Sequence, residues 1–184
     1  MKTLTMTCFL ALFSFASHAQ EITLESPAFA ADCAEGSTLT RSGQSLKVLI
    51  PTVIAQLESG TIARKRCTMA VPFDAPPGLQ VGVETVSVEA TASLGRGTRA
   101  TLAAEAFLAS SKGVVLKKSL RGPRSLSVQY NANASSIQWS RCGGAGMLRL
   151  NSSIVLQGKK PSTLAMSEIG LVLKTRPCQM ARAR

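Results

Sequence analysis

The chain has 184 residues, and its 21 lysine and arginine residues outnumber its 10 aspartate and glutamate residues, which gives a formal net charge of +11. This length is typical of one domain, and the charge favours contact with anionic polymers or surfaces. The single histidine, His18, lies in an apolar N-terminal stretch, so the rest of the chain has neither a Ser-His-Asp triad nor a Cys-His pair for nucleophilic catalysis.

The N-terminal segment has the pattern of a secretory signal peptide. Lys2 provides a positive start, an apolar run covers residues 8–16, and Ser17-His18-Ala19 is a small-x-small cleavage site. The apolar run is shorter than the roughly 20 residues that span a bilayer. We therefore expect residues 1–19 to be removed by cleavage after Ala19, leaving a secreted or periplasmic protein with one domain over residues 20–178.

Four cysteines follow this segment, and an even set of cysteines usually pairs in an oxidising compartment. Three connectivities are open to them, and we prefer pairing in sequence order because it closes two loops of similar size. None has another cysteine two to four residues away and no histidine follows, so we expect no metal site and no cofactor. The expected disulfide cysteines are Cys33, Cys67, Cys142 and Cys178.

From residue 45 onward, apolar and polar residues alternate in one short segment after another, which is the period of half-buried strands. The clearest segment is 81–94, where Val86, Val88 and Ala90 alternate with serine, glutamate and threonine. Residues 99–110 are rich in alanine, which also suits a helix, but their alternation and their neighbours predict a strand. The predicted strands are 45–50, 67–73, 81–94, 99–110, 113–120, 125–130, 137–139, 147–157 and 164–175.

Turn signals connect these strands and indicate the fold class. Gly122-Pro123 between two of the strands indicates a hairpin, and a shift of the alternation near Glu168 indicates a β-bulge. Eight or nine short strands and no predicted helix indicate an all-β protein, an antiparallel β-sandwich of the jelly-roll or immunoglobulin-like type with two disulfides. Residues 179–184 are predicted to form a disordered basic tail.

Six short motifs accompany the cysteines along the chain. They are Cys33-Ala34-Glu35-Gly36-Ser37, Arg64 before Cys67, Pro76-Pro77-Gly78, Trp139 before Cys142-Gly143, Leu148-Arg149-Leu150-Asn151 and Arg176-Pro177-Cys178. In order and spacing this set resembles an exported four-cysteine family catalogued as domain of unknown function 4360, although Ala34 stands where that family usually has proline. The resemblance implies secretion and a β-rich fold, and it supplies no catalytic residues.

Seven basic residues lie within residues 96–124, where Glu105 is the one acidic residue. If neighbouring strands and turns bring them to one edge or face, they would suit phosphate-bearing polymers or anionic lipid head groups. The alternative is an ordinary solvated surface on which Lys117 and Lys118 protect a sheet edge. The candidate anion-binding residues are Arg96, Arg99, Lys112, Lys117, Lys118, Arg121 and Arg124.

Three other motifs have both a functional and a structural interpretation. Trp139 would suit sugar stacking, but a tryptophan packed against the neighbouring disulfide is a known device of β-sandwiches, and we favour it. Arg64-Lys65-Arg66 would suit a processing site or a second anionic contact, yet we favour a structural role in which Arg64 holds the loop before Cys67 in place. The glycines after Cys142 are expected to form a tight turn with positive φ angles and not a phosphate loop.

These observations favour a non-catalytic protein over an enzyme. We predict an exported, monomeric β-sandwich that binds an anionic polysaccharide, lipid head groups or another envelope polymer, with no transmembrane segment and no specific recognition of nucleic acid. The alternative is a secreted hydrolase that uses a pair of carboxylates without histidine. The carboxylates of the central part of the chain are Asp74, Glu84, Glu89 and Glu105.

Overall fold

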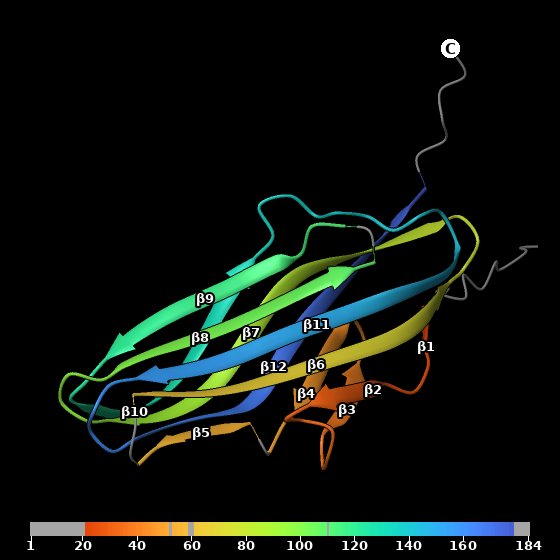
Figure 1. Ribbon diagram of the computed structural model, residues 1–184. Coiled ribbons are helices and arrows are strands. Elements are labelled where there is room, and N and C mark those ends of the chain that lie inside the picture. The colour runs from red at the N-terminus through yellow and green to blue at the C-terminus, as the bar shows by residue number, and fades with distance from the viewer. Residues whose placement is uncertain (1–20, 52, 59–60, 110, 179–184) are drawn as a thin grey trace, which may run out of the picture.

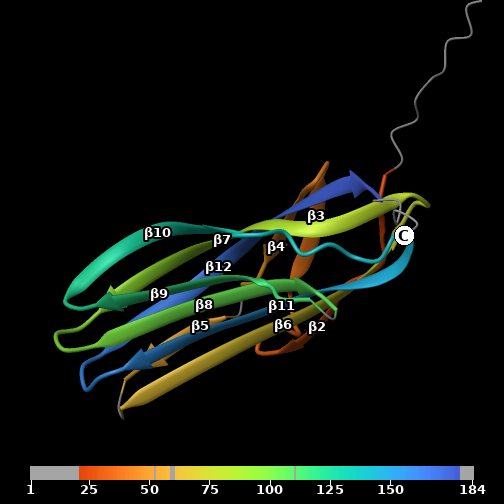
Figure 2. The ribbon, with the colours of Figure 1, turned by 90° about the horizontal axis from the view of Figure 1, so that it is seen from above.

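The structure is a computed structural model that describes residues 21–51, 53–58, 61–109 and 111–178. These residues form twelve strands in two antiparallel sheets that pack face to face (Figure 1, Figure 2). The predicted all-β sandwich with two disulfides is therefore confirmed. The predicted signal peptide and the predicted basic tail lie outside the described residues. Within the described segments, no helix is long and apolar enough to cross a membrane.

The front sheet, nearest the viewer in Figure 1, has the strand order β1-β6-β11-β8-β9, and β2 also pairs with β6. Its long strands, β6, β8 and β11, lie next to one another and form a broad outer surface. The bounds are β1 (Thr23–Leu24), β2 (Ala28–Ala31), β6 (Ile62–Ala75), β8 (Arg99–Leu108), β9 (Val114–Arg121) and β11 (Gly144–Gln157).

The back sheet has the strand order β10-β7-β12-β4-β3, and β5 also pairs with β12. Its two longest strands, β7 and β12, pair along most of their length. The bounds are β3 (Thr38–Ser42), β4 (Ser45–Leu49), β5 (Ile54–Leu57), β7 (Leu79–Leu94), β10 (Arg124–Asn133) and β12 (Ser162–Pro177).

Alternation along the strands creates the core, because successive side chains of a strand point to opposite faces of its sheet. In β8, Ala100, Leu102 and Ala104 are buried between the sheets, and the residues between them face outward. β8 pairs with β11 on one side and with β9 on the other, which confirms the strand predicted for this alanine-rich segment. Larger side chains from both sheets, such as Leu150 of β11 and Ile169 of β12, fill the space between them.

The number of strands differs from the prediction, because the structure has twelve strands and not eight or nine. Strands β1, β2, β3 and β5 have only two to five residues each, and three of them precede residue 45. Such short strands bury too few side chains to produce a visible alternation of apolar residues. Residues 137–139 form no strand, since Trp139 makes only an isolated bridge to Gly82.

The hairpin predicted at Gly122-Pro123 is wrong. β9 pairs with β8 in the front sheet, whereas β10 pairs with β7 in the back sheet, so this corner carries the chain from one sheet to the other. Turn residues signal a change of direction and do not specify the strand with which each side pairs. The β-bulge predicted near Glu168 is confirmed by a register shift between Met166 and Glu168, where β12 pairs with β7.

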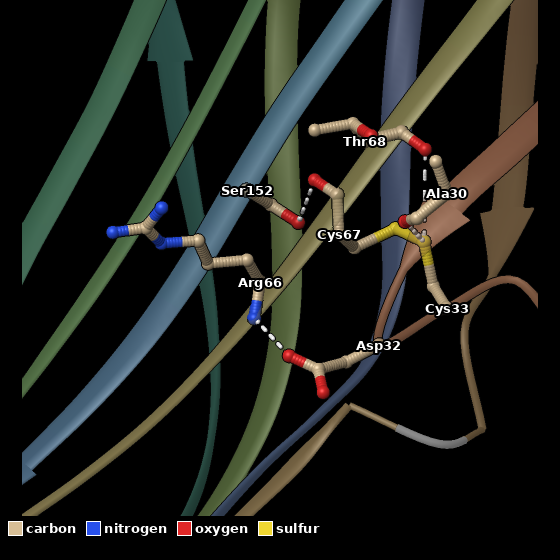
Figure 3. The surroundings of a disulfide bond; sticks show 7 residues. All are labelled: Ala30, Asp32, Cys33, Arg66, Cys67, Thr68 and Ser152. Carbon is tan, nitrogen blue, oxygen red and sulfur yellow. Dashed lines mark hydrogen bonds between the residues drawn. A yellow bond between two sulfur atoms is a disulfide. The ribbon is translucent and has the colours of Figure 1, made fainter.

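Both disulfides join cysteines in sequence order, Cys33 with Cys67 and Cys142 with Cys178, as the loop sizes led us to expect. The Cys33–Cys67 bond joins the segment after β2 to β6, and both of its residues are 0% exposed (Figure 3). Cys142, in contrast, is exposed at the surface. The two disulfides therefore have different surroundings, one in the core and one at the periphery.

Asp32 attaches the segment around the buried disulfide to β6. Its carboxylate accepts hydrogen bonds from Nζ of Lys65 at 2.9 Å and from the backbone N–H of Arg66 at 2.7 Å, the second of which is drawn in Figure 3. The hydrogen bond from Lys65, followed by the one from Arg66, lowers the pKa of Asp32 below its ordinary value of 3.8.

We expect the Asp32 carboxylate to stabilise the fold above pH 3.8 and to lose this effect in acid. A carboxyl group whose pKa is lower in the folded state stabilises the fold while ionised, and the contribution disappears as the pH falls through the folded-state pKa. The wild type should therefore melt at a higher temperature than Asp32→Asn near neutral pH, and this difference should shrink well below pH 3.8. A difference in melting temperature that stays constant with pH would contradict this role.

Candidate functional site

The outward-facing side of the front sheet carries a group of four cations, here called the basic face. Arg64 and Arg66 come from β6, Lys117 from β9 and Arg149 from β11, and all four residues are exposed. Arg149 illustrates why they point outward, because its two neighbours in β11 are buried between the sheets. Three strands of the front sheet thus contribute positive charge to one surface.

A shallow groove of about 460 Å³ crosses the basic face. The middle of the groove presents hydroxyl and amide groups and short side chains, with Arg66 in its wall. The groove crosses the neighbouring strands β6, β11, β8 and β9. Since neighbouring strands lie about 4.8 Å apart, these four strands span about 14 Å. Strand register aligns two rows across it, Arg66–Ser153–Ala103–Lys117 and Thr68–Asn151–Glu105–Val115.

The four cations of the basic face take part in none of the ion pairs found within the described segments. One carboxylate, that of Glu105, lies in the groove, and a second, that of Asp74, lies toward the far end of β6. A third, that of Asp32, lies beside the backbone of Arg66, where it is already paired with Lys65. Unpaired exposed cations gain most from an external anion, because they lose no existing partner when it binds. The ion pairs found are Arg41–Glu21, Lys47–Glu168, Lys65–Asp32 and Lys174–Glu84.

The structure distributes the seven predicted anion-binding residues over the sandwich, with four together and three apart. Lys117 belongs to the basic face, and Lys112 lies in the loop between β8 and β9. Lys118 lies on the edge strand β9, with its Nζ 5.5 Å from the centroid of the Tyr130 ring. The remaining four lie near the connections from β7 to β8 and from β9 to β10, and they are Arg96, Arg99, Arg121 and Arg124.

The run Arg64-Lys65-Arg66 contains one lysine with a carboxylate partner and two exposed arginines. Lys65 forms an ion pair with Asp32 at 2.9 Å, whereas Arg64, to which we assigned the structural role, takes part in none of the ion pairs found in the described segments. Arg64 and Arg66 are exposed, and in Figure 3 the side chain of Arg66 extends over β11. Lys65 therefore attaches β6 to the segment around Asp32, and an anionic contact by the two arginines stays a prediction.

Three cations that lie near the candidate residues in the structure were not predicted as site residues, and they are Arg149, Lys159 and Lys160. The alternation around Arg149 marks it as outward-facing, but its neighbours are known only from the pairing of β11 with β6 and β8. Lys159 and Lys160 lie in the turn between β11 and β12. Their place in the folded protein follows from the order of the strands in both sheets, which the sequence pattern does not reveal.

Trp139 lies at the opposite end of the sandwich, near the Cys142–Cys178 disulfide. The guanidinium carbon of Arg176 lies 4.3 Å from the centroid of the indole ring, and Nε of Arg176 donates a hydrogen bond to Oε1 of Gln80 at 3.0 Å. One face of the ring is thus covered by a side chain that is itself held in place.

The turn predicted after Cys142 has the expected backbone conformation, because Gly143 and Gly144 have φ angles of 65° and 78°.

Solved structures are only loosely similar to this chain, and no curated protein matches it. The TmCBM61 module in complex with β-1,4-galactotriose is 10% identical, with 85% of this chain and 92% of that chain covered and a TM-score of 0.31. The N-terminal cellulose-binding domain of Cellulomonas fimi β-1,4-glucanase C is 14% identical, with 83% and 91% covered and a TM-score of 0.26. The family 11 carbohydrate-binding module of Clostridium thermocellum is 10% identical, with 86% and 91% covered and a TM-score of 0.24.

A family model, in contrast, matches most of the chain. The match extends over residues 29–178, from β2 to the last described residue, and includes all four disulfide cysteines. It agrees with the resemblance that the motifs around these cysteines indicate. The chain belongs to the family described as Domain of unknown function (DUF4360).

Proposed function

We propose that this protein is an exported, non-catalytic binding module that holds an acidic polysaccharide on its basic face. The observation that carries the proposal is the groove across the front sheet, which is lined by Arg66 and flanked by Lys117, with no ion pair to either cation in the described segments. Two disulfides fit an oxidising, extracytoplasmic compartment. Export itself rests on the predicted signal peptide.

The form of the groove favours a polymer over a small ligand. It is shallow and runs across several strands, so a chain molecule can lie in it and continue beyond both edges. Thr68, Asn151 and Ser153 offer hydroxyl and amide groups that suit the hydroxyl groups of a sugar. Arg66 and Lys117 lie at the two ends of the row Arg66–Ser153–Ala103–Lys117. From there they would contact carboxylate or sulfate groups of successive sugars.

The hydrolase alternative receives less support from the positions of the carboxylates. Glu89 of β7 and Glu168 of β12 are register partners on the outer side of the back sheet, but Glu168 forms an ion pair with Lys47 at 3.1 Å. Neither glutamate lines one of the surface depressions found in the described segments. Among the residues that line the groove of the basic face, Glu105 is the one with a carboxylate. A glycosidase would need two carboxylates facing each other across a bound sugar.

We expect the double variant Arg66→Gln/Lys117→Gln to bind polygalacturonate about fivefold more weakly than the wild type, since two exposed charge contacts contribute about 0.5 kcal/mol each. Wild-type binding should weaken steeply with added salt, and binding to neutral dextran should be absent. Affinity electrophoresis and titration calorimetry with both polymers measure these effects.

The matched control is Lys47→Gln/Lys174→Gln, which removes the same net charge from the back sheet. It should bind polygalacturonate like the wild type. Equal losses in both double variants would show that net charge alone attracts the polymer, and binding that is insensitive to salt or equal for dextran would contradict the proposal. Release of reducing ends from the polymer, lost on Glu105→Gln, would instead support the hydrolase.

A further inference from the structure

Three connections of the sandwich meet at the end that lies to the left in both views, and together they are here called the turn end (Figure 1, Figure 2). They are the β7–β8, β9–β10 and β11–β12 turns. None of these turns contains a carboxylate, and Glu58, after β5, is on the neighbouring connection at this end. The turns and the strand residues beside them carry six cations, Arg96, Arg99, Arg121, Arg124, Lys159 and Lys160.

A buried polar pair, Thr98 and Ser162, holds the three turns together. These residues are 2% and 6% exposed. Oγ of Ser162 accepts the N–H of Gly95 at 2.9 Å and lies 3.0 Å from both Oγ1 of Thr98 and the carbonyl oxygen of Lys160. The N–H of Gly122 donates to the carbonyl oxygen of Thr98 at 2.9 Å. Every turn is thus tied to the same two residues.

The turns also touch backbone to backbone. A Cβ atom built on Gly122 would lie 2.1 Å from the carbonyl oxygen of Gly95, and one built on Gly95 would lie 2.7 Å from Cβ of Lys160. The turns therefore approach so closely that no side-chain atom fits between them at these glycines. The cations they carry are therefore held on a fixed frame, which lowers the entropy cost of binding an anion between them.

Arg99 and Arg121 form the centre of this arrangement. They are register partners on β8 and β9 and face the same side, so two positive charges lie directly opposite each other, which disfavours the fold. A surface depression of about 230 Å³ lies at this position, lined by both arginines together with Gly97, Thr98 and Gly122. Neither arginine has an ion pair among those found in the described segments.

We propose that the turn end is a second binding site, which takes a phosphoryl group between Arg99 and Arg121. Two guanidinium groups side by side offer more donors than a planar carboxylate accepts, whereas a phosphoryl group has three acceptor oxygens and a charge near −2. The other four cations lie on or beside the same three turns and raise the local concentration of anions. The site goes beyond the proposed polysaccharide function, because none of its residues lines the groove of the basic face.

The phosphoryl group has two sources, free phosphate or a phosphate carried on a polymer. Titration calorimetry with inorganic phosphate, pyrophosphate and polyphosphate separates them. If the affinity per phosphate is equal for all three ligands, the site binds free phosphate. If the affinity rises steeply with the number of linked phosphates, the site binds a phosphate-bearing polymer. Phosphate should also raise the melting temperature more than chloride at the same ionic strength, and the absence of any such difference would overturn the site.

The test variant is Arg99→Gln/Arg121→Gln, and its matched control is again Lys47→Gln/Lys174→Gln. The test variant should bind pyrophosphate more weakly by on the order of tenfold, because charge-assisted hydrogen bonds are lost. Without phosphate it should melt at a higher temperature than the wild type, since the repulsion between the opposed arginines is gone. Unchanged pyrophosphate affinity in the test variant, or an equal loss in the control, would overturn the proposal.

The two proposed sites fail or succeed independently. Arg66→Gln/Lys117→Gln should keep the response to pyrophosphate and lose affinity for polygalacturonate, and Arg99→Gln/Arg121→Gln should do the reverse. A protein that responds to pyrophosphate without binding polygalacturonate would retain the turn-end site and lose the basic-face function.

Discussion

Replacing Cys33 and Cys67 together with alanine is expected to lower the free energy of unfolding by about 3–4 kcal/mol. The bond closes a loop across a sequence separation of 34 residues, and both cysteines are fully buried. It also fastens the short strand β2 to β6, with which β2 forms only four register pairs. Urea denaturation followed by circular dichroism measures the change.

The second disulfide provides a control of nearly equal loop length. Cys142 and Cys178 are separated by 36 residues, so the loop-closure contribution is almost the same for Cys142→Ala/Cys178→Ala. Because Cys142 is exposed, the second double variant leaves no comparable gap in the core. The Cys33/Cys67 variant should therefore be the less stable of the two, and the opposite order would contradict the importance of its burial.

Replacing Gly122 with alanine is expected to destabilise the protein by about 2–3 kcal/mol. This is the usual cost of adding an atom to a closely packed region whose backbone cannot easily shift. The added Cβ would lie 2.1 Å from the carbonyl oxygen of Gly95 and 2.9 Å from that of Leu94. Both contacts are with backbone atoms at the end of β7 and the start of the turn that follows it, so relief requires the β9–β10 turn to move away from them. Thermal and chemical unfolding measure the loss, and the response to pyrophosphate should weaken with it.

Gly97→Ala is the control for this prediction, because it lies at the same end of the sandwich. Its φ angle is 78°, and nothing lies within 4 Å of a Cβ built there. It should cost only the strain of the left-handed conformation, about 1 kcal/mol. If Gly97→Ala destabilised the protein as much as Gly122→Ala, close packing of the turns would not explain the effect.

The fold was predictable where strands are long enough to alternate. The nine alternating residues from Val86 to Leu94 make β7 evident, and the shift near Glu168 marks the bulge of β12. The shortest strands escaped prediction because they depend on pairing with β6 and β12 and not on a pattern of their own. Pairing partners are a property of the whole chain, and for this reason the turn at Gly122 was assigned to a hairpin that does not exist.

The candidate sites were predictable only in part, for the same physical reason. Four of the seven basic residues in the central segment do lie together, since the β7–β8 and β9–β10 turns bring them to one end. Lys160 joins them from a third turn that is distant in the sequence, through contact with Gly95. Arg66 and Arg149 share a face with Lys117 because β6, β11, β8 and β9 are neighbours in that order, which the sequence pattern does not reveal.

The groove of the basic face runs across the strands, and this direction limits what one molecule can hold. A polymer lying in it would meet only the width of four strands, about 14 Å, however long the polymer is. If the proposed function holds, each protein molecule would therefore occupy a short stretch, and a long polyanion would have room for many molecules side by side. Retention on such a polymer would depend on avidity, with linked or crowded copies rebinding faster than each one escapes.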